Sequence, residues 1–217
     1  LGGLGLLQDA IVQLAGALGE PVPDISRRAA VVFCADNGVV AEGVTQCGQE
    51  VTATVAENFL DEKSCVAIMC KRANTKICPV DIGMSIDTPR VEKRKIAYGT
   101  ENMTKKPAMT REQAIAAIEV GIARAEELKA EGYEVLATGE MGIGNTTTSS
   151  AMTAVYLGLD VETVTGRGAG LSTDGLQRKI QAIKKAIACN QPDPKDPLDV
   201  LAKVGGFDIA GMCGLFL

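Results

Sequence analysis

Apolar residues along this chain recur with helical spacing in some segments and in strand-length runs in others. Helical spacing covers residues 6–18, 50–60, 64–72, 110–131 and 173–189. Strand-length apolar runs cover 29–35, 75–82 and 134–137, and a further short strand is predicted at 159–164. Alternation of the two patterns predicts an α/β fold with a mostly parallel sheet and crossover helices.

The rest of the chain is predicted to form connections and helix ends. Residues 87–107 lose both patterns, mix basic and turn residues, and are expected to form a surface excursion. Thr110 and Gln113 are spaced as a capping box at the start of a long helix. Residues 190–197 are expected to form a proline-set loop, followed by a short helix over 198–204.

The segment ATGEMGIGNTTTSSA, residues 137–151, places glycines, an acid and a row of hydroxyls where a strand gives way to a helix. Gly139, Gly142 and Gly144 are expected to allow positive backbone dihedrals and close approach of a ligand. Asn145 and Thr146 are expected to cap the following helix, whose positive end favours an anion such as phosphate. The alternative is an ordinary turn that needs glycine only for its dihedrals.

Polar or glycine-rich sequence also follows the other predicted strands. These segments are 36–38 (DNG), 81–83 (DIG), 138–140 (TGE), 165–168 (TGRG) and 205–208 (GGFD). Ligands bind outside the carboxyl ends of strands in open parallel sheets, so we expect these segments to converge on one crevice.

Composition and charge exclude several classes of binding partner and of catalytic group. The 217 residues suffice for one sizeable α/β domain with a smaller appendage, and the net charge of -5 argues against nucleic acid or an anionic membrane surface as a partner. No apolar run is long enough to cross a bilayer and the start does not resemble a signal peptide, so a cytoplasmic protein is expected. Seven cysteines without a C-x-x-C pair favour reduced, mostly buried thiols. Because the chain has no histidine, acid–base chemistry must use carboxylates, lysine, tyrosine or thiol.

Four segments, in this order, carry a specific resemblance: 34–52 (CADNGVVAEGVTQCGQEVT), 138–152 (TGEMGIGNTTTSSAM), 166–171 (GRGAGL) and 203–214 (KVGGFDIAGMCG). Together they resemble the nicotinate-nucleotide–dimethylbenzimidazole phosphoribosyltransferase family of cobalamin assembly, over nearly the whole chain. The resemblance implies a doubly wound, Rossmann-like three-layer α/β domain with a small helical subdomain. Residues 1–27 would belong to that subdomain and 28–217 to the substrate-binding domain, in a homodimer.

The resemblance also implies the reaction. Ribose phosphate would pass from nicotinate mononucleotide to a benzimidazole nitrogen, giving α-ribazole 5'-phosphate and nicotinate, without a cofactor or metal. Substrate would contact Glu140, Gly142, Gly144, Asn145, Thr146, Arg167, Gly168, Lys179 and Asp208. By position alone Lys179 could equally be a solvated surface lysine, and Asp208 could be the N-cap of the last helix.

The sequence departs from the family pattern around the acceptor base, where the resemblance places Asp36, Asn37, Cys47 and Val55. Asn37 stands where many relatives carry histidine, and Cys47 and Val55 replace a serine and a glutamine. A less polar pocket is therefore expected, with broad tolerance among acceptor bases.

The chain ends at Leu217, before the family's C-terminal segment and its general-base glutamate. Glu140 is the nearest substitute for that base, and the chain alone is expected to bind a nucleotide but to turn it over poorly. The alternative function is a module that binds a nucleotide or sugar phosphate without chemistry.

Overall fold

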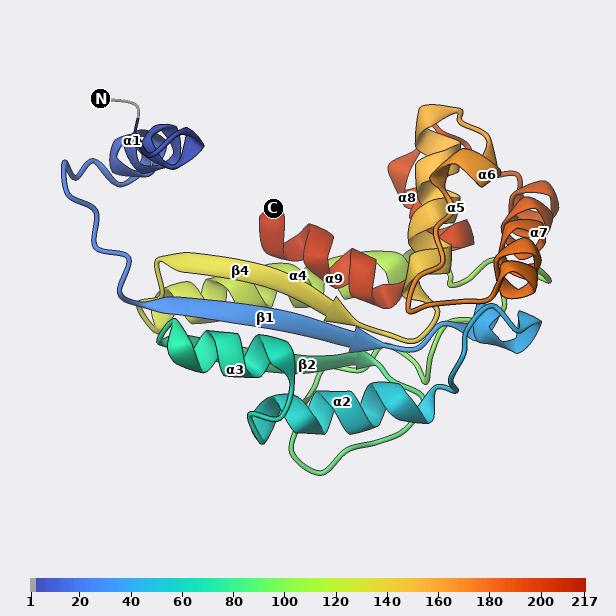
Figure 1. The fold of residues 1–217 in the computed structure, drawn as a ribbon, viewed down its shortest axis with the longest axis horizontal. Coiled ribbons are helices and arrows are strands. Elements are labelled where there is room, and N and C mark those ends of the chain that lie inside the picture. The colour runs from blue at the N-terminus through green and yellow to red at the C-terminus, as the bar shows by residue number, and fades with distance from the viewer. Residues whose placement is uncertain (1–2) are drawn as a thin grey trace.

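The computed structural model describes residues 3–217, in which four parallel strands form one sheet in the order β3-β2-β1-β4 (Figure 1). The strands are β1 (Arg28–Ala35), β2 (Thr75–Gly83), β3 (Glu92–Lys93) and β4 (Val135–Met141). Arg28 at the start of β1 lies opposite Thr75 on one side and Val135 on the other. The sheet confirms the prediction of an α/β fold with parallel strands and crossover helices.

Helices cover both faces of the sheet. Val31 and Phe33 of β1 belong to a core cluster with α4 (Arg111–Ala130) and α9 (Phe207–Phe216), whereas Val32 and Cys34 pack with α2 (Glu50–Leu60). A further crossover helix, α3 (Cys65–Arg72), contacts β2. Because neither face meets water, β1 is apolar at consecutive positions. The doubly wound, three-layer arrangement is therefore confirmed.

Four further helices gather at the carboxyl ends of the strands (Figure 1). They are α5 (Asn145–Leu157), α6 (Val161–Val164), α7 (Thr173–Asn190) and α8 (Pro197–Val204), and η1 (Gly38–Glu42) packs beside them. A separate apolar cluster, including Ile183 and Val204, holds this group together. The group forms one wall of the crevice at the ends of β1 and β4.

Helix α1 (Leu6–Leu18) stands apart from the sheet and contains no buried residue (Figure 1). An extended segment joins it to β1. The assignment of residues 1–27 to a small helical domain remains a prediction.

Glycines bring α4 and α9 into backbone contact. A Cβ on Gly121 would lie 2.1 Å from the carbonyl oxygen of Gly211, and a Cβ on Gly214 would lie 1.9 Å from that of Ile118. Gly211 also leaves no room for a side chain beside Phe33 of the sheet. This close packing holds α9, whose first turn carries Asp208, against α4 and the sheet.

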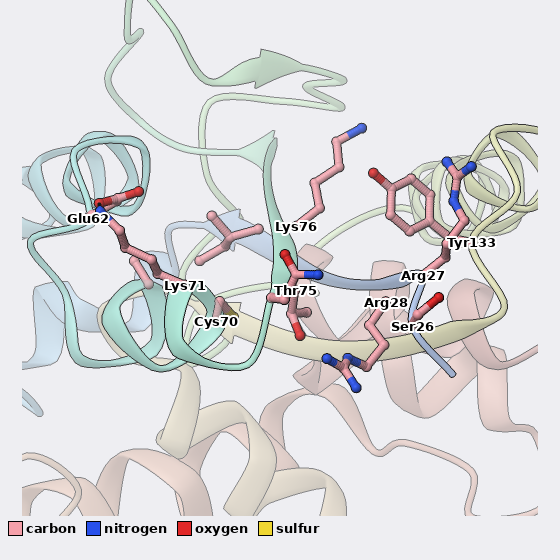
Figure 2. Close-up of a pocket in the computed structure, with 12 residues that line it drawn as sticks. Ser26, Arg27, Arg28, Glu62, Cys70, Lys71, Thr75, Lys76 and Tyr133 are labelled. Carbon is pink, nitrogen blue, oxygen red and sulfur yellow. Dashed lines mark hydrogen bonds and ion pairs between the residues drawn. The ribbon is translucent and has the colours of Figure 1, made fainter. Parts of the chain in front are cut away.

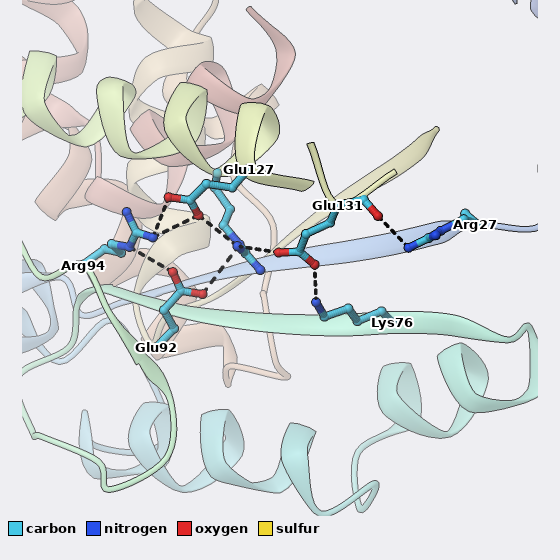
Figure 3. A network of polar contacts seen from close by, with 7 residues as sticks. Arg27, Lys76, Glu92, Arg94, Glu127 and Glu131 are labelled. Atoms are coloured by element: carbon cyan, nitrogen blue, oxygen red, sulfur yellow. Dashed lines mark hydrogen bonds and ion pairs between the residues drawn. The ribbon is translucent and has the colours of Figure 1, made fainter. Parts of the chain in front are cut away.

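A polar network joins α4 to the β3 edge of the sheet (Figure 3). The guanidinium of Arg124 contacts the carboxylates of Glu92, Glu127 and Glu131. Arg94 pairs with Glu92 and Glu127, while Lys76 pairs with Glu131. The network continues to the start of β1, where Arg27 donates to the carbonyl oxygen of Glu131.

Two sequence predictions about local structure are wrong. Residues 159–164 contain the one-turn helix α6, not a strand, and Thr165 closes its end with a hydrogen bond to the carbonyl oxygen of Val161. A short apolar run fits a strand or a buried helical turn equally well, and packing between α5 and α7 selects the turn. Residues 87–107 are not a surface excursion, because they supply β3 and bury Val91 and Met103.

All seven cysteines are free thiols, but only three are buried, namely Cys34, Cys70 and Cys78. Cys65, Cys189 and Cys213 are exposed and Cys47 is intermediate, so the prediction that most are buried is wrong. The capping box is confirmed, since Thr110 and Gln113 exchange side chain to backbone hydrogen bonds. Within residues 3–217, none of the helices has the length and apolar character needed to cross a membrane.

Candidate active site

A cavity of about 320 Å³ lies at the carboxyl end of the sheet, between the loops that follow β1, β4 and α6. Eight of the predicted site residues line it: Cys47, Gly142, Gly144, Asn145, Thr146, Arg167, Gly168 and Lys179. The cavity draws residues from three of the four resembling segments, 34–52, 138–152 and 166–171. Of the five segments expected to converge at the strand ends, only 165–168 lines it. The segment carrying Asp208 lies behind this wall, where a Cβ on Gly206 would meet Asn37.

The glycines of the GEMGIG sequence, residues 139–144, have different reasons to be glycine. Gly139 lies inside β4, whereas Gly142 and Gly144 lie in the β4–α5 turn. Only Gly144 has a positive φ, of 95°, so the prediction is wrong for Gly139 and Gly142. A Cβ on Gly142 would lie 2.1 Å from the carbonyl oxygen of Ala35, so this glycine lets the turn press against the end of β1. A Cβ on Gly139 would make only an ordinary contact with Val32, at 3.7 Å.

No side chain caps the N-terminus of α5. The N-cap residue is Gly144, and no hydrogen bond from a cap side chain is present, so the predicted capping by Asn145 and Thr146 is wrong. Both residues lie inside the first turn, where Asn145 donates to the Glu140 carboxylate and Thr146 accepts from Lys179. The positive end of α5 therefore faces the cavity without a side-chain acceptor, which favours an anion there.

Lys179 is a buried cation in the cavity wall. Only 1% of it is exposed, so the surface-lysine interpretation is wrong. Its ammonium donates to the Thr146 hydroxyl at 2.6 Å and to the carbonyl oxygen of Gly166 at 3.1 Å, and it forms no ion pair with any carboxylate in residues 3–217. Burial lowers the pKa of Lys179. An anion in the cavity would supply the missing counter-charge.

The GRGAGL loop is pressed against this lysine. Gly168 has a φ of 56°, and a Cβ there would lie 2.9 Å from the Thr146 hydroxyl oxygen and 3.6 Å from the Lys179 nitrogen. Arg167 donates to the carbonyl oxygen of Leu171 at 2.7 Å and to the Thr173 hydroxyl at 3.2 Å. Arg167 thereby ties the loop to the start of α7, the helix that carries Lys179.

Two carboxylates belong to the segments around the cavity but do not line it, namely those of Glu140 and Asp208. Glu140 is exposed as a residue. The protein nevertheless shields its carboxyl group partly from water, and this desolvation raises the pKa of Glu140. Asp208 is fully buried, and neither of its carboxylate oxygens has a hydrogen-bond partner among the described residues. Burial, with repulsion from Glu140, raises the pKa of Asp208 to about 7. Gly206 is the N-cap of α9, so the N-cap interpretation of Asp208 is wrong.

Of the residues assigned to the acceptor base, only Cys47 lines the cavity. Asp36 and Asn37 are fully buried, and Val55 packs against the apolar cluster between α2 and the sheet. The Asp36 carboxylate accepts hydrogen bonds from the Thr52 hydroxyl and from Ser85. Its observed contacts are therefore structural, and the assignment of these residues to a base pocket stays a prediction.

Sequence reasoning missed Thr52 and Gln46. Thr52 joins the Asp36 carboxylate to the β4–α5 turn, and Gln46, in the cavity wall, donates to the carbonyl oxygen of Gly170. Both lie in the first of the four resembling segments, and Thr52 is a polar residue on the sheet-facing side of a helix. A polar residue on the sheet-facing side of a helix is the sequence signal that could have pointed to Thr52.

A larger cavity of about 500 Å³ lies at the opposite end of the strands (Figure 2). Its cations do not converge on one point: Lys71 points toward Glu62, and Arg27 lies beside Tyr133 (Figure 2). Arg28 donates to the carbonyl oxygen of Ala73. This cavity therefore does not form a focused anion site.

Comparisons with known proteins agree with the geometry. A family model described as Phosphoribosyltransferase matches residues 1–217. The nicotinate-nucleotide–dimethylbenzimidazole phosphoribosyltransferase of Acetivibrio thermocellus is 51% identical over 219 residues, which cover 100% of this chain and 62% of that protein. The protein of the same name from Clostridium tetani is 45% identical and 60% covered.

The solved structure of CobT from Thermus thermophilus has a TM-score of 0.93 and 40% identity to this chain, with 99% of this chain and 65% of that chain covered. The chain thus spans about three fifths of the length of the curated relatives described above. Full coverage of the chain by the family model, together with these identities, confirms the resemblance read from the sequence. The chain belongs to the phosphoribosyltransferase family whose curated members are named nicotinate-nucleotide–dimethylbenzimidazole phosphoribosyltransferase.

Proposed function

We propose that this chain carries the phosphoribosyl-donor site of an enzyme that transfers ribose phosphate from nicotinate mononucleotide to a benzimidazole-type base. The products would be α-ribazole 5'-phosphate and nicotinate, for the nucleotide loop of cobalamin. One observation carries the proposal: among residues 3–217 the buried ammonium of Lys179 has only neutral acceptors, and it lies in a cavity wall beside the uncapped end of α5. The names of the relatives support the choice of substrates.

The donor phosphate would sit between Lys179 and the first turn of α5. Lys179 would provide a charge-assisted hydrogen bond, and the backbone around Gly142 and Gly144 would provide amide donors. The Thr146 hydroxyl and the Gly166 carbonyl, which already accept hydrogen bonds from the lysine, would hold its ammonium in place.

The leaving group requires no acid, because the pyridinium ring of nicotinate mononucleotide is already cationic. Positive charge instead develops on the ribose, as in other glycosyl transfers. Glu140 and Asp208 would supply negative charge or hydrogen-bond acceptors near the phosphate site. Glu140 is the candidate base within this chain, while the resemblance places the family's own base beyond Leu217.

The protein would work as a homodimer in the cytoplasm. Family resemblance supports the homodimer, and exposed apolar side chains on α1, such as Leu6 and Val12, are suited to burial against another surface. Seven free thiols, three of them exposed, suit a reducing compartment.

Replacement of Lys179 tests the proposal. We expect Lys179→Met to weaken nicotinate mononucleotide binding about 10–100-fold, since a charge-assisted hydrogen bond contributes roughly 1.5–3 kcal/mol. Titration calorimetry measures the dissociation constant, and circular dichroism checks the fold. The matched control is Lys184→Met, on the same helix but exposed and paired with Glu162, which should leave binding unchanged. Equal affinity in Lys179→Met and wild type would refute the donor site.

The acceptor side gives a second test. Because Cys47 and Val55 offer few hydrogen-bonding groups, the site should reject poorly matched bases only weakly. Competition between dimethylbenzimidazole and unsubstituted benzimidazole, followed by product chromatography, should give a preference below about a hundredfold. A stricter preference would contradict the proposed low polarity of the pocket.

A further inference from the structure

Thr52 makes a buried hydrogen-bond bridge between the end of β1 and the β4–α5 turn. Its hydroxyl donates to a carboxylate oxygen of Asp36 at 2.6 Å and accepts from the backbone N–H of Ile143 at 3.1 Å. Thr52 and Asp36 are both 0% exposed. Ile143 lies between Gly142 and Gly144, in the turn that faces the cavity.

Asp36 is itself held rigidly. Its second carboxylate oxygen accepts from the backbone N–H of Ser85 at 2.7 Å and from the Ser85 hydroxyl at 2.8 Å. Its backbone N–H donates to the carbonyl oxygen of Gly83, and its backbone carbonyl accepts from Thr100. Asp36 thus joins the ends of β1 and β2, and Thr52 transmits that fixed position to the turn.

We propose that Thr52 and Asp36 are positioning residues for the phosphate site, an inference that rests on the proposed function. Neither lines the cavity, so both would act through the backbone of Ile143. With the turn held by this bridge and by the contact of Gly142 with Ala35, the first turn of α5 stays at a set distance from Lys179. The side chains of Lys179 and Thr146 then meet at hydrogen-bond distance before any ligand arrives.

Loss of the Thr52 hydroxyl would leave two buried groups without partners, the Ile143 N–H and one Asp36 oxygen. Such groups are costly in a site closed to water, so the turn is expected to shift until they are satisfied. A shift of the turn moves the N-terminus of α5 away from the lysine. Phosphate affinity should fall although no group that touches phosphate has changed.

The test compares Thr52→Val, which keeps the shape but removes the hydroxyl, with Thr52→Ser, which keeps the hydroxyl. Thr88→Val is the matched control, because the Thr88 hydroxyl is also buried but has no partner among the described residues. In the full chain, Thr52→Val should weaken nicotinate mononucleotide binding about 5–20-fold, while the other two variants stay within about twofold of wild type.

Amide hydrogen exchange of Ile143, followed by NMR without ligand, gives an independent readout. Exchange should be faster in Thr52→Val than in wild type or Thr52→Ser.

Wild-type affinity in Thr52→Val, or equal weakening in Thr52→Ser, would overturn the inference. If wild type does not bind nicotinate mononucleotide, the proposed function fails, whereas unchanged Ile143 exchange would refute the bridge alone. If Thr52→Val does not fold, Thr52→Cys replaces it, and its weaker hydrogen bonds should give intermediate affinity; wild-type affinity would refute the inference.

Discussion

Asp208 is a carboxyl group whose ionised form is destabilised by the folded core. Its carboxyl is fully buried, both oxygens lack partners among residues 3–217, and Glu140 adds repulsion. An arrangement of this kind is typical of functional sites, where groups are kept for a ligand at a cost in stability.

The raised pKa of Asp208 predicts the direction in which stability changes with pH. Asp208 has a pKa of about 7 in the folded chain against an ordinary value of 3.8, so the folded state binds its proton more tightly. Its contribution to stability is therefore greatest below the unfolded pKa and is lost as pH rises toward 7. Relative to wild type, Asp208→Asn should gain about 1–3 kcal/mol in free energy of unfolding between pH 4 and pH 8.

Urea denaturation at the two pH values measures this change as a difference between variant and wild type. Asp160→Asn is the control, since Asp160 is exposed and makes no side-chain cap bond. A pH-independent difference for Asp208→Asn would show that its carboxyl is ionised to the same extent in the folded and unfolded states.

At the scale of elements, the β4–α5 connection is shaped by the neighbouring strand as well as by its own dihedrals. Gly142 packs against the carbonyl of Ala35, where any Cβ would overlap backbone. Gly139, three residues earlier in the same motif, has ordinary space around it. Two glycines that look equivalent in the sequence thus have different tolerance to substitution.

We expect Gly142→Ala to lower the free energy of unfolding by about 2–4 kcal/mol, because backbone must move to admit the methyl group. Gly139→Ala should change it by less than about 1 kcal/mol. Chemical denaturation of both variants measures the contrast. Similar stabilities for the two would mean that the turn relaxes away from β1 without cost.

At the scale of the molecule, ion pairs on one side hold the sheet edge to α4, and a hydrogen bond from Arg27 extends this network to the start of β1 (Figure 3). Arg124 is the most buried cation of the network, with a side chain 10% exposed that contacts three carboxylates. Arg90, outside this network, pairs with Glu57 and Asp61 but is 48% exposed. Solvent screens the ion pairs of Arg90 much more than those of Arg124.

Arg124→Met should therefore destabilise the chain by about 1–3 kcal/mol, and Arg90→Met by less than about 1 kcal/mol. Thermal and urea denaturation at low and high salt give the two values. An equal loss in both variants would show that burial of Arg124 adds nothing to the strength of the network.

Most helices and strands could be predicted from the sequence, whereas one short segment and the long-range polar contacts could not. The strand at 29–35 and the capping box at Thr110 were predicted correctly, because strand-length apolar runs and caps depend on neighbouring residues. The prediction for residues 159–164 was wrong because one apolar turn has no period to measure. The polar contacts of Thr52 could not be predicted, since its partners lie 16 and 91 residues away.

The chain alone was enough to predict the α/β class, the glycine-rich turn and, through four motifs in order, the family. These properties depend on residue type and spacing, which the sequence states directly. Packing in three dimensions was needed to establish that Lys179 is buried without a paired carboxylate among residues 3–217 and that Asp36 joins the ends of β1 and β2. It was also needed to establish that burial raises the pKa of Asp208 to about 7. Burial and pairing arise from elements that meet across the sheet, and the chemistry of a charged side chain depends on those neighbours more than on its position in the chain.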